Sequence, residues 1–115
     1  MNLNLMKRIA MHSDHKSYKH VALIFSGGRL LSYGYNTNTM HAEVSALKRL
    51  DRIYRTYNSR RPRNLHLVSF MLRKKTGNIG SSSPCDSCWD AIVGAKVRTV
   101  TYYNHSSGGW INTWV

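Results

Sequence analysis

The spacing of apolar residues changes several times along the chain, and each change predicts a new element of secondary structure. Near the start, apolar residues three to four positions apart predict a short amphipathic helix over residues 2–12. Two apolar runs, 21–25 and 30–35, flank a Ser-Gly-Gly-Arg sequence at 26–29, which is typical of a β-hairpin. The helical period then returns and predicts a longer helix over residues 41–54.

The second half of the chain continues this alternation. Residues 65–72 and 97–103 are further apolar runs, and each predicts a strand. Between them a helix is expected to open at Pro84 and to end near Gly94, where glycine suits the C-cap. A turn-rich segment and the alternating residues 110–115 predict a last strand that returns antiparallel to the one before it.

The order of these elements predicts a single α/β domain over residues 1–115. A chain of this length has room for one hydrophobic core and for no second domain. Its 42% hydrophobic content is that of a folded globular protein. We expect helices on both faces of a mixed five-stranded sheet, with loops at 58–64 and 76–83.

Composition limits the cellular setting. The apolar stretch at 21–25 is far too short to cross a bilayer, and the first four residues lack the apolar region of a signal peptide. We therefore expect an intracellular, cytoplasmic protein with no membrane partner. The two cysteines, Cys85 and Cys88, are spaced poorly for a disulfide framework and well for a metal or redox pair.

The charge balance is strongly basic. The chain has 17 Lys and Arg residues against 5 Asp and Glu residues, a formal net charge of +12. An excess of this size favours an anionic partner such as a nucleic acid or a nucleotide. The alternative is a solvated basic surface that binds no ligand.

Residues that can bind a metal or transfer protons lie at the starts of the two later predicted helices. His41 and Glu43 begin one helix, and Cys85 and Cys88 begin the next. One imidazole and two thiolates suit tetrahedral Zn²⁺ and leave a fourth position for water, as in catalytic sites. Glu43 cannot share the ligand direction of His41 on a regular helix, so it is a candidate for proton transfer. Each residue also has an alternative role when it is considered alone. His41 could cap the helix, Glu43 could interact with the helix dipole, and the two cysteines could form a redox pair.

Together, these residues match the H-x-E and P-C-x-x-C signature of zinc deaminases. The chain resembles the cytidine deaminase-like superfamily, and the resemblance covers almost its whole length. It implies a cytidine deaminase-like three-layer sandwich with an antiparallel C-terminal hairpin. It also implies a resident Zn²⁺ held by His41, Cys85 and Cys88, and Glu43 as the general acid and base of a hydrolytic deamination.

The resemblance further suggests substrate-binding residues. Asn36 follows the second strand, where family members contact the sugar, and Asn38 is the alternative. Ser83 stands in a Ser-Pro-Cys sequence like that of polynucleotide cytidine deaminases, and Ala42 lies between the two residues of the H-x-E motif. Tyr103 closes the strand where polynucleotide relatives stack on a neighbouring base. The asparagines also suit a loop, and Tyr103 also suits packing within the hairpin.

The residues leave three functions open. The net charge and Ser83 favour deamination of cytosine in single-stranded nucleic acid. Small size and the C-terminal hairpin favour a nucleotide-pool enzyme acting on cytidine, deoxycytidine or dCMP, and such enzymes are often homo-oligomers. A catalytically inactive zinc-containing module that binds nucleic acid is the third, and the retained Glu43 argues against it. Adenine-type and drug-type substrates also stay open.

Two basic sets differ in their expected distance from the site. Lys48, Arg52 and Arg55 share the helix face opposite its apolar stripe, and we expect this face to point away from the metal ligands. Residues 73–75, an Arg-Lys-Lys sequence, follow the third strand on the loop leading to Pro84. We expect this second set to guide a phosphate toward the site.

Overall fold

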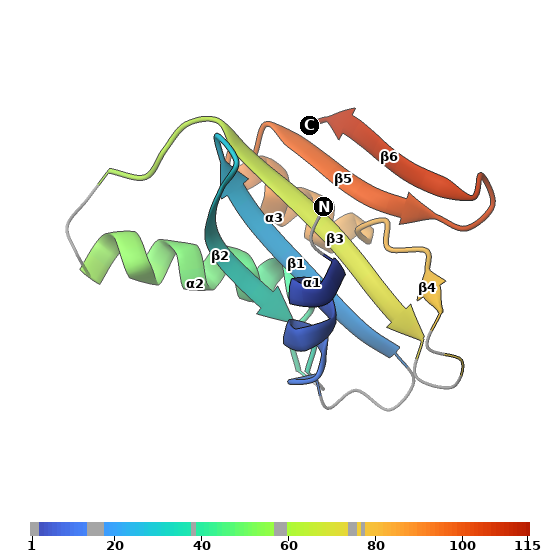
Figure 1. Ribbon diagram of the computed structural model, residues 1–115. Coiled ribbons are helices and arrows are strands. Elements are labelled where there is room, and N and C mark those ends of the chain that lie inside the picture. The colour runs from blue at the N-terminus through green and yellow to red at the C-terminus, as the bar shows by residue number, and fades with distance from the viewer. Residues whose placement is uncertain (1–2, 14–17, 38, 57–59, 74–75, 77) are drawn as a thin grey trace.

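The structure is a computed structural model that describes residues 3–13, 18–37, 39–56, 60–73, 76 and 78–115. Its helices and strands alternate along the chain (Figure 1). In chain order they are α1 (Leu3–Ala10), β1 (Tyr18–Ser26), β2 (Arg29–Tyr35), α2 (Ala42–Thr56), β3 (Leu65–Arg73), β4 (Ile79–Gly80), α3 (Asp86–Gly94), β5 (Thr99–Asn104) and β6 (Gly109–Trp114).

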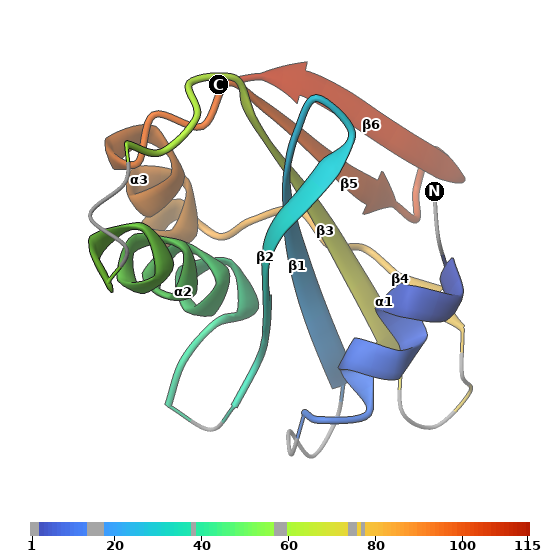
Figure 2. The same cartoon turned by 60° about the vertical axis from the view of Figure 1, so that its left-hand side comes forward.

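The strands form one mixed sheet. Five of them lie side by side in the order β2-β1-β3-β5-β6, and β4 pairs with β3 outside this path. β3 and β5 pair in parallel and are joined through α3, as a parallel connection requires. Helices α2 and α3 cover one face of the sheet and α1 the other (Figure 2). The predicted three-layer α/β arrangement with an antiparallel C-terminal hairpin is therefore confirmed.

The central strands are buried on both faces, so successive side chains enter two separate cores. On the α1 side, Leu23 of β1 belongs to one apolar cluster with Met6 and Phe70. On the other side, Ile24 belongs to a cluster with Leu47 of α2 and Ile92 of α3. This alternation fixes which strand residues can face the starts of α2 and α3.

The β-hairpin predicted near residue 27 is present. Ser26 pairs with Arg29, and Gly27 and Gly28 form the two-residue turn with φ angles of 57° and 81°. Positive φ at both central residues is the geometry of the turn that best matches strand twist, and glycine adopts it without steric cost.

The sheet has six strands rather than the five predicted. The sequence placed residues 76–83 entirely in a loop, but Ile79 and Gly80 form β4 and pair with Leu72 and Met71 of β3. A strand of two residues carries no alternation of apolar and polar positions that the sequence could reveal.

The end of α3 differs from the expectation of a glycine cap. Gly94 is the last residue of the helix, Ala95 is the C-cap, and the left-handed backbone falls on Lys96 with a φ of 60°. The Ala95 amide donates to the carbonyl oxygen of Ala91 and so continues the helical bonding past the glycine. Gly94 therefore does not supply the turn that ends this helix.

The starts of two strands also differ from the prediction. β1 begins at Tyr18 instead of Val21, which brings His20 into the sheet, and β5 begins at Thr99 instead of Val97. The earlier start of β1 matters most, because His20 then occupies a regular position facing the same side as Ala22.

Helix α2 lies unusually close to β2. A side-chain carbon added at Gly34 would lie 2.4 Å from both the Ala42 carbonyl oxygen and the Ala46 amide nitrogen. The Ser32 hydroxyl donates to the Ala46 carbonyl oxygen at 2.8 Å in the same region. This contact holds the first turns of α2, and with them the H-x-E motif, against the sheet.

None of the helices within the described residues is long and apolar enough to span a membrane. Several positions singled out in the sequence, namely Asn38, Lys74, Lys75 and the start of the 58–64 segment, lie outside the described residues.

Candidate functional site

Two helix starts meet at the site. His41 immediately precedes α2, and its carbonyl oxygen accepts from the Ser45 amide at 3.0 Å. Cys85 is the N-cap of α3, and its carbonyl oxygen accepts from the Trp89 amide at 2.8 Å. Both residues thus stand at the positive end of a helix, where the exposed amides favour negative charge such as a thiolate.

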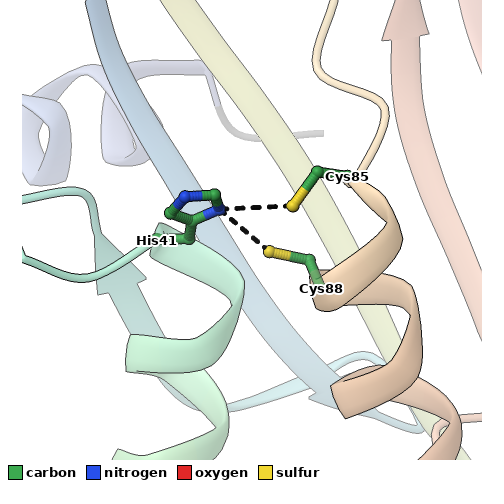
Figure 3. A group of neighbouring side chains, drawn as sticks. All are labelled: His41, Cys85 and Cys88. Atoms are coloured by element: carbon green, nitrogen blue, oxygen red, sulfur yellow. Dashed lines mark hydrogen bonds between the residues drawn. The ribbon is translucent and has the colours of Figure 1, made fainter.

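The side chains of His41, Cys85 and Cys88 point toward one another (Figure 3). His41 Nδ1 lies 3.2 Å from the Cys88 sulfur and 3.4 Å from the Cys85 sulfur. The three donor atoms lie within 4.8 Å of one another. His41 and Cys85 are exposed whereas Cys88 is buried, so the group opens to solvent on one side. These residues could hold a metal ion.

The two thiols differ in their acidity. A hydrogen bond from the Ser87 side chain lowers the pKa of Cys85 to about 7. Burial, reinforced by the negative charge of Glu43, raises the pKa of Cys88 to about 12. A cation bound between them would favour the thiolate form of both, because it supplies the positive charge that the buried sulfur lacks.

Glu43 lies in the first turn of α2 with a side chain that is only 1% exposed. Its Oε1 atom is buried and has no hydrogen-bond partner among the described residues. A buried carboxylate oxygen without a partner is costly and therefore rare. The imidazole of His20 lies close to it, with Nδ1 3.7 Å from Oε1.

A cavity of about 250 Å³ opens beside His41. It is lined by residues from the start of β1, the end of β2 and the segment leading to α2, namely Tyr18, His20, Asn36, Thr37, Thr39, Met40 and His41. Its size and its polar lining suit a small polar ligand next to the candidate metal ligands.

Asn36 lines this cavity, but its amide is engaged with the chain. Its Oδ1 accepts from the Ser13 hydroxyl at 2.5 Å and from the His20 amide at 2.9 Å, and its Nδ2 donates to the Tyr18 carbonyl oxygen at 3.2 Å. Asn36 thus fixes the edge of the cavity as well as lining it. Its contact with a substrate stays a prediction.

The other suggested substrate residues lie elsewhere around the site. Ala42, the first residue of α2, is fully buried in the core, and Ser83 is exposed just before Pro84. Tyr103 is half-buried and packs edge-on against Trp110 at 5.5 Å between ring centres, as the hairpin-packing alternative expected. These three residues are absent from the lining of the cavity beside His41. Their roles in substrate binding also stay predictions.

His20 is the residue of the site that sequence reasoning missed. His20 lies on the same side of β1 as the core residues Ala22 and Ile24. The alternation along the strand predicts an apolar residue at this position, but His20 places a polar ring there. Its Nε2 lies 2.5 Å from the Ser69 hydroxyl of β3. Burial lowers the pKa of His20, against the opposing charge of Glu43. The predicted strand start at Val21 had left His20 outside the sheet.

The basic face of α2 borders a second hollow, of about 620 Å³. Its cationic lining residues are Lys48, Arg49, Arg52 and Arg55. Met40 lines both this hollow and the cavity beside His41, so the two adjoin. The sequence had led us to expect this face to point away from the site. Arg73, from the second basic set, is the last residue of β3 and pairs with Tyr18 of β1.

The fold is similar to that of a known enzyme structure. A crystal structure of a cytidine deaminase from Burkholderia pseudomallei matches with a TM-score of 0.61 at 17% sequence identity, covering 99% of this chain and 93% of that chain. At this identity the likeness establishes the shared fold. Comparisons with protein-family models and with curated protein sequences gave no match.

Proposed function

We propose that this protein is a zinc-dependent hydrolytic deaminase that converts cytosine to uracil, with release of ammonia, in single-stranded nucleic acid. The observation that carries the proposal is the meeting of His41, Cys85 and Cys88 at two helix starts, with the buried carboxylate of Glu43 in the same helix as the histidine. The fold shared with a cytidine deaminase supports it.

The donor set fits zinc. In a tetrahedral site with the usual Zn–N and Zn–S bond lengths, nitrogen and sulfur donors lie roughly 3.5 Å apart. The corresponding distances from His41 Nδ1 are 3.2 Å and 3.4 Å. One nitrogen and two sulfurs are borderline-to-soft ligands, and three protein ligands leave the fourth position that a catalytic site requires.

The chain's own residues then supply the acid–base chemistry. Zinc bound at the site acts as a Lewis acid and makes water a competent nucleophile near neutral pH. Glu43 accepts one proton of the attacking water and passes it to the ring nitrogen. It then moves the second proton of that water from the new hydroxyl to the exocyclic amine, which leaves as ammonia. Water oxygen replaces the exocyclic amine, so cytosine and water give uracil and ammonia. The low exposure of Glu43 keeps this proton from bulk solvent.

Charge supports a polynucleotide substrate. The net charge of +12 attracts phosphates, and the cations of the α2 hollow adjoin the cavity through Met40. The exposed side chain of Tyr18 lines the same cavity. A strand lying along α2 could therefore deliver one nucleotide to the cavity beside His41.

A nucleotide-pool enzyme is the second candidate. The antiparallel hairpin of β5 and β6 and the similarity to the structure of a cytidine deaminase favour it. The cavity of about 250 Å³ is small, and most of its lining is polar, as a free nucleoside would also require.

An activity panel tests the proposal. Free cytidine, dCMP, single-stranded and double-stranded oligonucleotides are incubated with the zinc-loaded protein, and uracil is measured. We expect the single-stranded oligonucleotide to give the highest kcat/KM. The isosteric Glu43→Gln variant should lose roughly 10²–10⁴-fold in kcat with an unchanged zinc content, since the carboxylate moves protons and is not a ligand.

Two other results of the panel would replace the proposal. Faster turnover of dCMP or cytidine than of every oligonucleotide would make the protein a nucleotide-pool enzyme. A zinc-loaded protein that binds oligonucleotide and turns over none of the four substrates would be an inactive binding module.

A further inference from the structure

The segment that leads into α3 is held between two parallel strands. The ladder between β3 and β5 ends with the pair of Ser69 and Tyr102. One residue further along β5, the Tyr103 amide donates to the Ser82 hydroxyl oxygen at 2.9 Å, and the Tyr103 carbonyl oxygen accepts from the Ser82 amide at 3.0 Å. Ser82 therefore lies where the two strands separate, three residues before Cys85.

On the β3 side of this segment, hydroxyl groups take the place of backbone amides. The Arg73 amide donates to the Asn78 carbonyl oxygen at 2.9 Å, and every second pair of an antiparallel ladder is bonded in this way. The register of β3 with β4 makes Ser69 and Ser82 such a pair. There the Ser82 hydroxyl donates to the Ser69 carbonyl oxygen at 2.8 Å, and the Ser69 hydroxyl donates to the Ser82 carbonyl oxygen at 2.6 Å. The Ser82 amide is thus left to bond with β5.

This Ser69–Ser82 pair is shielded from water. Ser69 is fully buried and Ser82 is only 2% exposed. The Ser82 hydroxyl both donates to Ser69 and accepts from Tyr103, so its loss would leave a buried carbonyl oxygen and a buried amide without those bonds. Buried polar groups that lose a partner are costly because water cannot replace it. The pair therefore fixes the direction in which the chain enters Pro84.

Cys85 is the candidate ligand that depends on this segment. It is the N-cap of α3 and has an extended backbone, with φ −73° and ψ 170°, so it continues the incoming chain. Cys85 is also exposed, whereas Cys88 lies within α3 and is buried. Packing of the helix places Cys88, but the position of the Cys85 sulfur follows from the chain before it.

We propose that the Ser69–Ser82 pair is a positioning element for the metal site: it sets the place of Cys85 relative to Cys88 and His41. The proposal rests on the proposed function and deepens it, because it concerns the same candidate ligands. When the pair is broken, the segment before Pro84 can shift between β3 and β5, and the three donor atoms no longer converge as closely.

Two single variants break the pair to different degrees. Ser82→Ala removes the hydroxyl that bonds to both β3 and β5. Ser69→Ala removes the reciprocal bond and the contact of Ser69 with His20, but it leaves both bonds of the Ser82 hydroxyl in place. Thr101→Val is the matched control, because the Thr101 hydroxyl is also buried in β5 and bonds to His66 and Asn112, which lie outside this segment.

The affinity for Zn²⁺, measured by competition with a chelator, reports the role of the pair. We expect Ser82→Ala to weaken Zn²⁺ binding by roughly tenfold or more, because groups that orient metal ligands typically contribute 10–100-fold. Ser69→Ala should weaken it by a smaller factor, and Thr101→Val should stay within about twofold of the wild type. In the double variant of Ser69 and Ser82 the losses should not add fully, since the two residues bond to each other.

Cobalt bound in place of zinc tests the geometry directly. The absorption spectrum of Co²⁺ depends on the number and arrangement of its thiolate ligands. We expect Ser82→Ala to change this spectrum and to lower the thiolate absorption per bound ion, and Thr101→Val to leave it unchanged. The thermal midpoint of each metal-free protein is measured alongside, so that a general loss of stability is seen separately from a change at the site.

The outcomes separate positioning from a purely structural contact. Wild-type affinity and an unchanged cobalt spectrum in both serine variants would overturn the proposal, and so would an equal loss of affinity in Thr101→Val. If Ser82→Ala fails to fold, the milder Ser69→Ala decides by the same comparison. Inactivity of the zinc-loaded wild type on every substrate would instead refute the proposed function, and the metal measurements would still decide the role of the pair.

Discussion

Gly34 is the residue that allows α2 to approach the sheet. A methyl group at this position would meet two backbone atoms, Ala42 O and Ala46 N, each at 2.4 Å. Backbone atoms in a helix cannot yield as the end of a flexible side chain can. The first turn of α2 carries Glu43 and follows His41, so any displacement would move both groups.

Gly34→Ala should therefore destabilise the fold and weaken the site together. We expect a loss of about 1–3 kcal/mol or more in the free energy of unfolding, because the added carbon overpacks a closed contact. Gly94→Ala is the matched control, since a carbon added there meets nothing within 4 Å and alanine favours the helix. Denaturant unfolding of both variants is the measurement. Equal stability of the two would show that the contact at Gly34 relaxes freely.

The residues that make up the candidate metal site were the part of the site most easily predicted from the sequence. His41, Glu43, Cys85 and Cys88 could be selected from spacing alone, because two motifs at helix starts need only local sequence to be recognised. His20 could not, since it is placed by a contact with Ser69, which lies 49 positions away along the chain and meets it across paired strands. A contact of that kind leaves no periodic trace in the sequence.

At the scale of elements, the alternation of helices and strands followed from hydrophobic period, because each long element buries one face or both. The short strand β4 and the cap of α3 did not, since each depends on a few backbone bonds made after the larger elements have packed. The direction of the basic α2 face likewise depends on how α2 sits on the sheet. That arrangement is set by Gly34 and Ser32 rather than by the helix's own pattern.

The side chains of the candidate metal group join the starts of α2 and α3. A bound metal should tie these two helix ends, so its removal should loosen their first turns locally. We expect faster hydrogen exchange of the Ser45 and Trp89 amides, which donate to the carbonyl oxygens of His41 and Cys85. Exchange measured by mass spectrometry, before and after chelation, checks this.

The central strands provide the internal reference for that experiment. Leu23 and Phe70 lie in the core on the α1 side, away from the helix starts, and exchange at their amides should be unaffected by chelation. Zinc added back should restore the original rates. Uniform acceleration across the chain would mean that the metal stabilises the whole fold rather than the junction of α2 and α3.

At the scale of the whole molecule, positive charge lies on both sides of the sheet. Lys48 and Arg52 project from α2 beside the hollow that adjoins the site, whereas Lys7 and Arg8 belong to α1 on the opposite face (Figure 2). Long-range attraction would draw a polyanion to either face. The hollow beside Lys48 and Arg52 adjoins the cavity beside His41, so under the proposed function phosphates bound there would also position a nucleotide for reaction.

Two variants that remove equal charge can therefore distinguish contact from general attraction. We expect Lys48→Gln with Arg52→Gln to reduce the salt dependence of single-stranded oligonucleotide binding by about 1.4 in the log–log slope, because each phosphate contact contributes roughly 0.7. It should also raise KM for the oligonucleotide and leave KM for free cytidine unchanged. Lys7→Gln with Arg8→Gln should change the slope far less. Fluorescence titrations across a salt series give the slopes. If both double variants alter the slope equally, the α2 face is not the path of the strand, and the +12 charge acts only as a diffuse field.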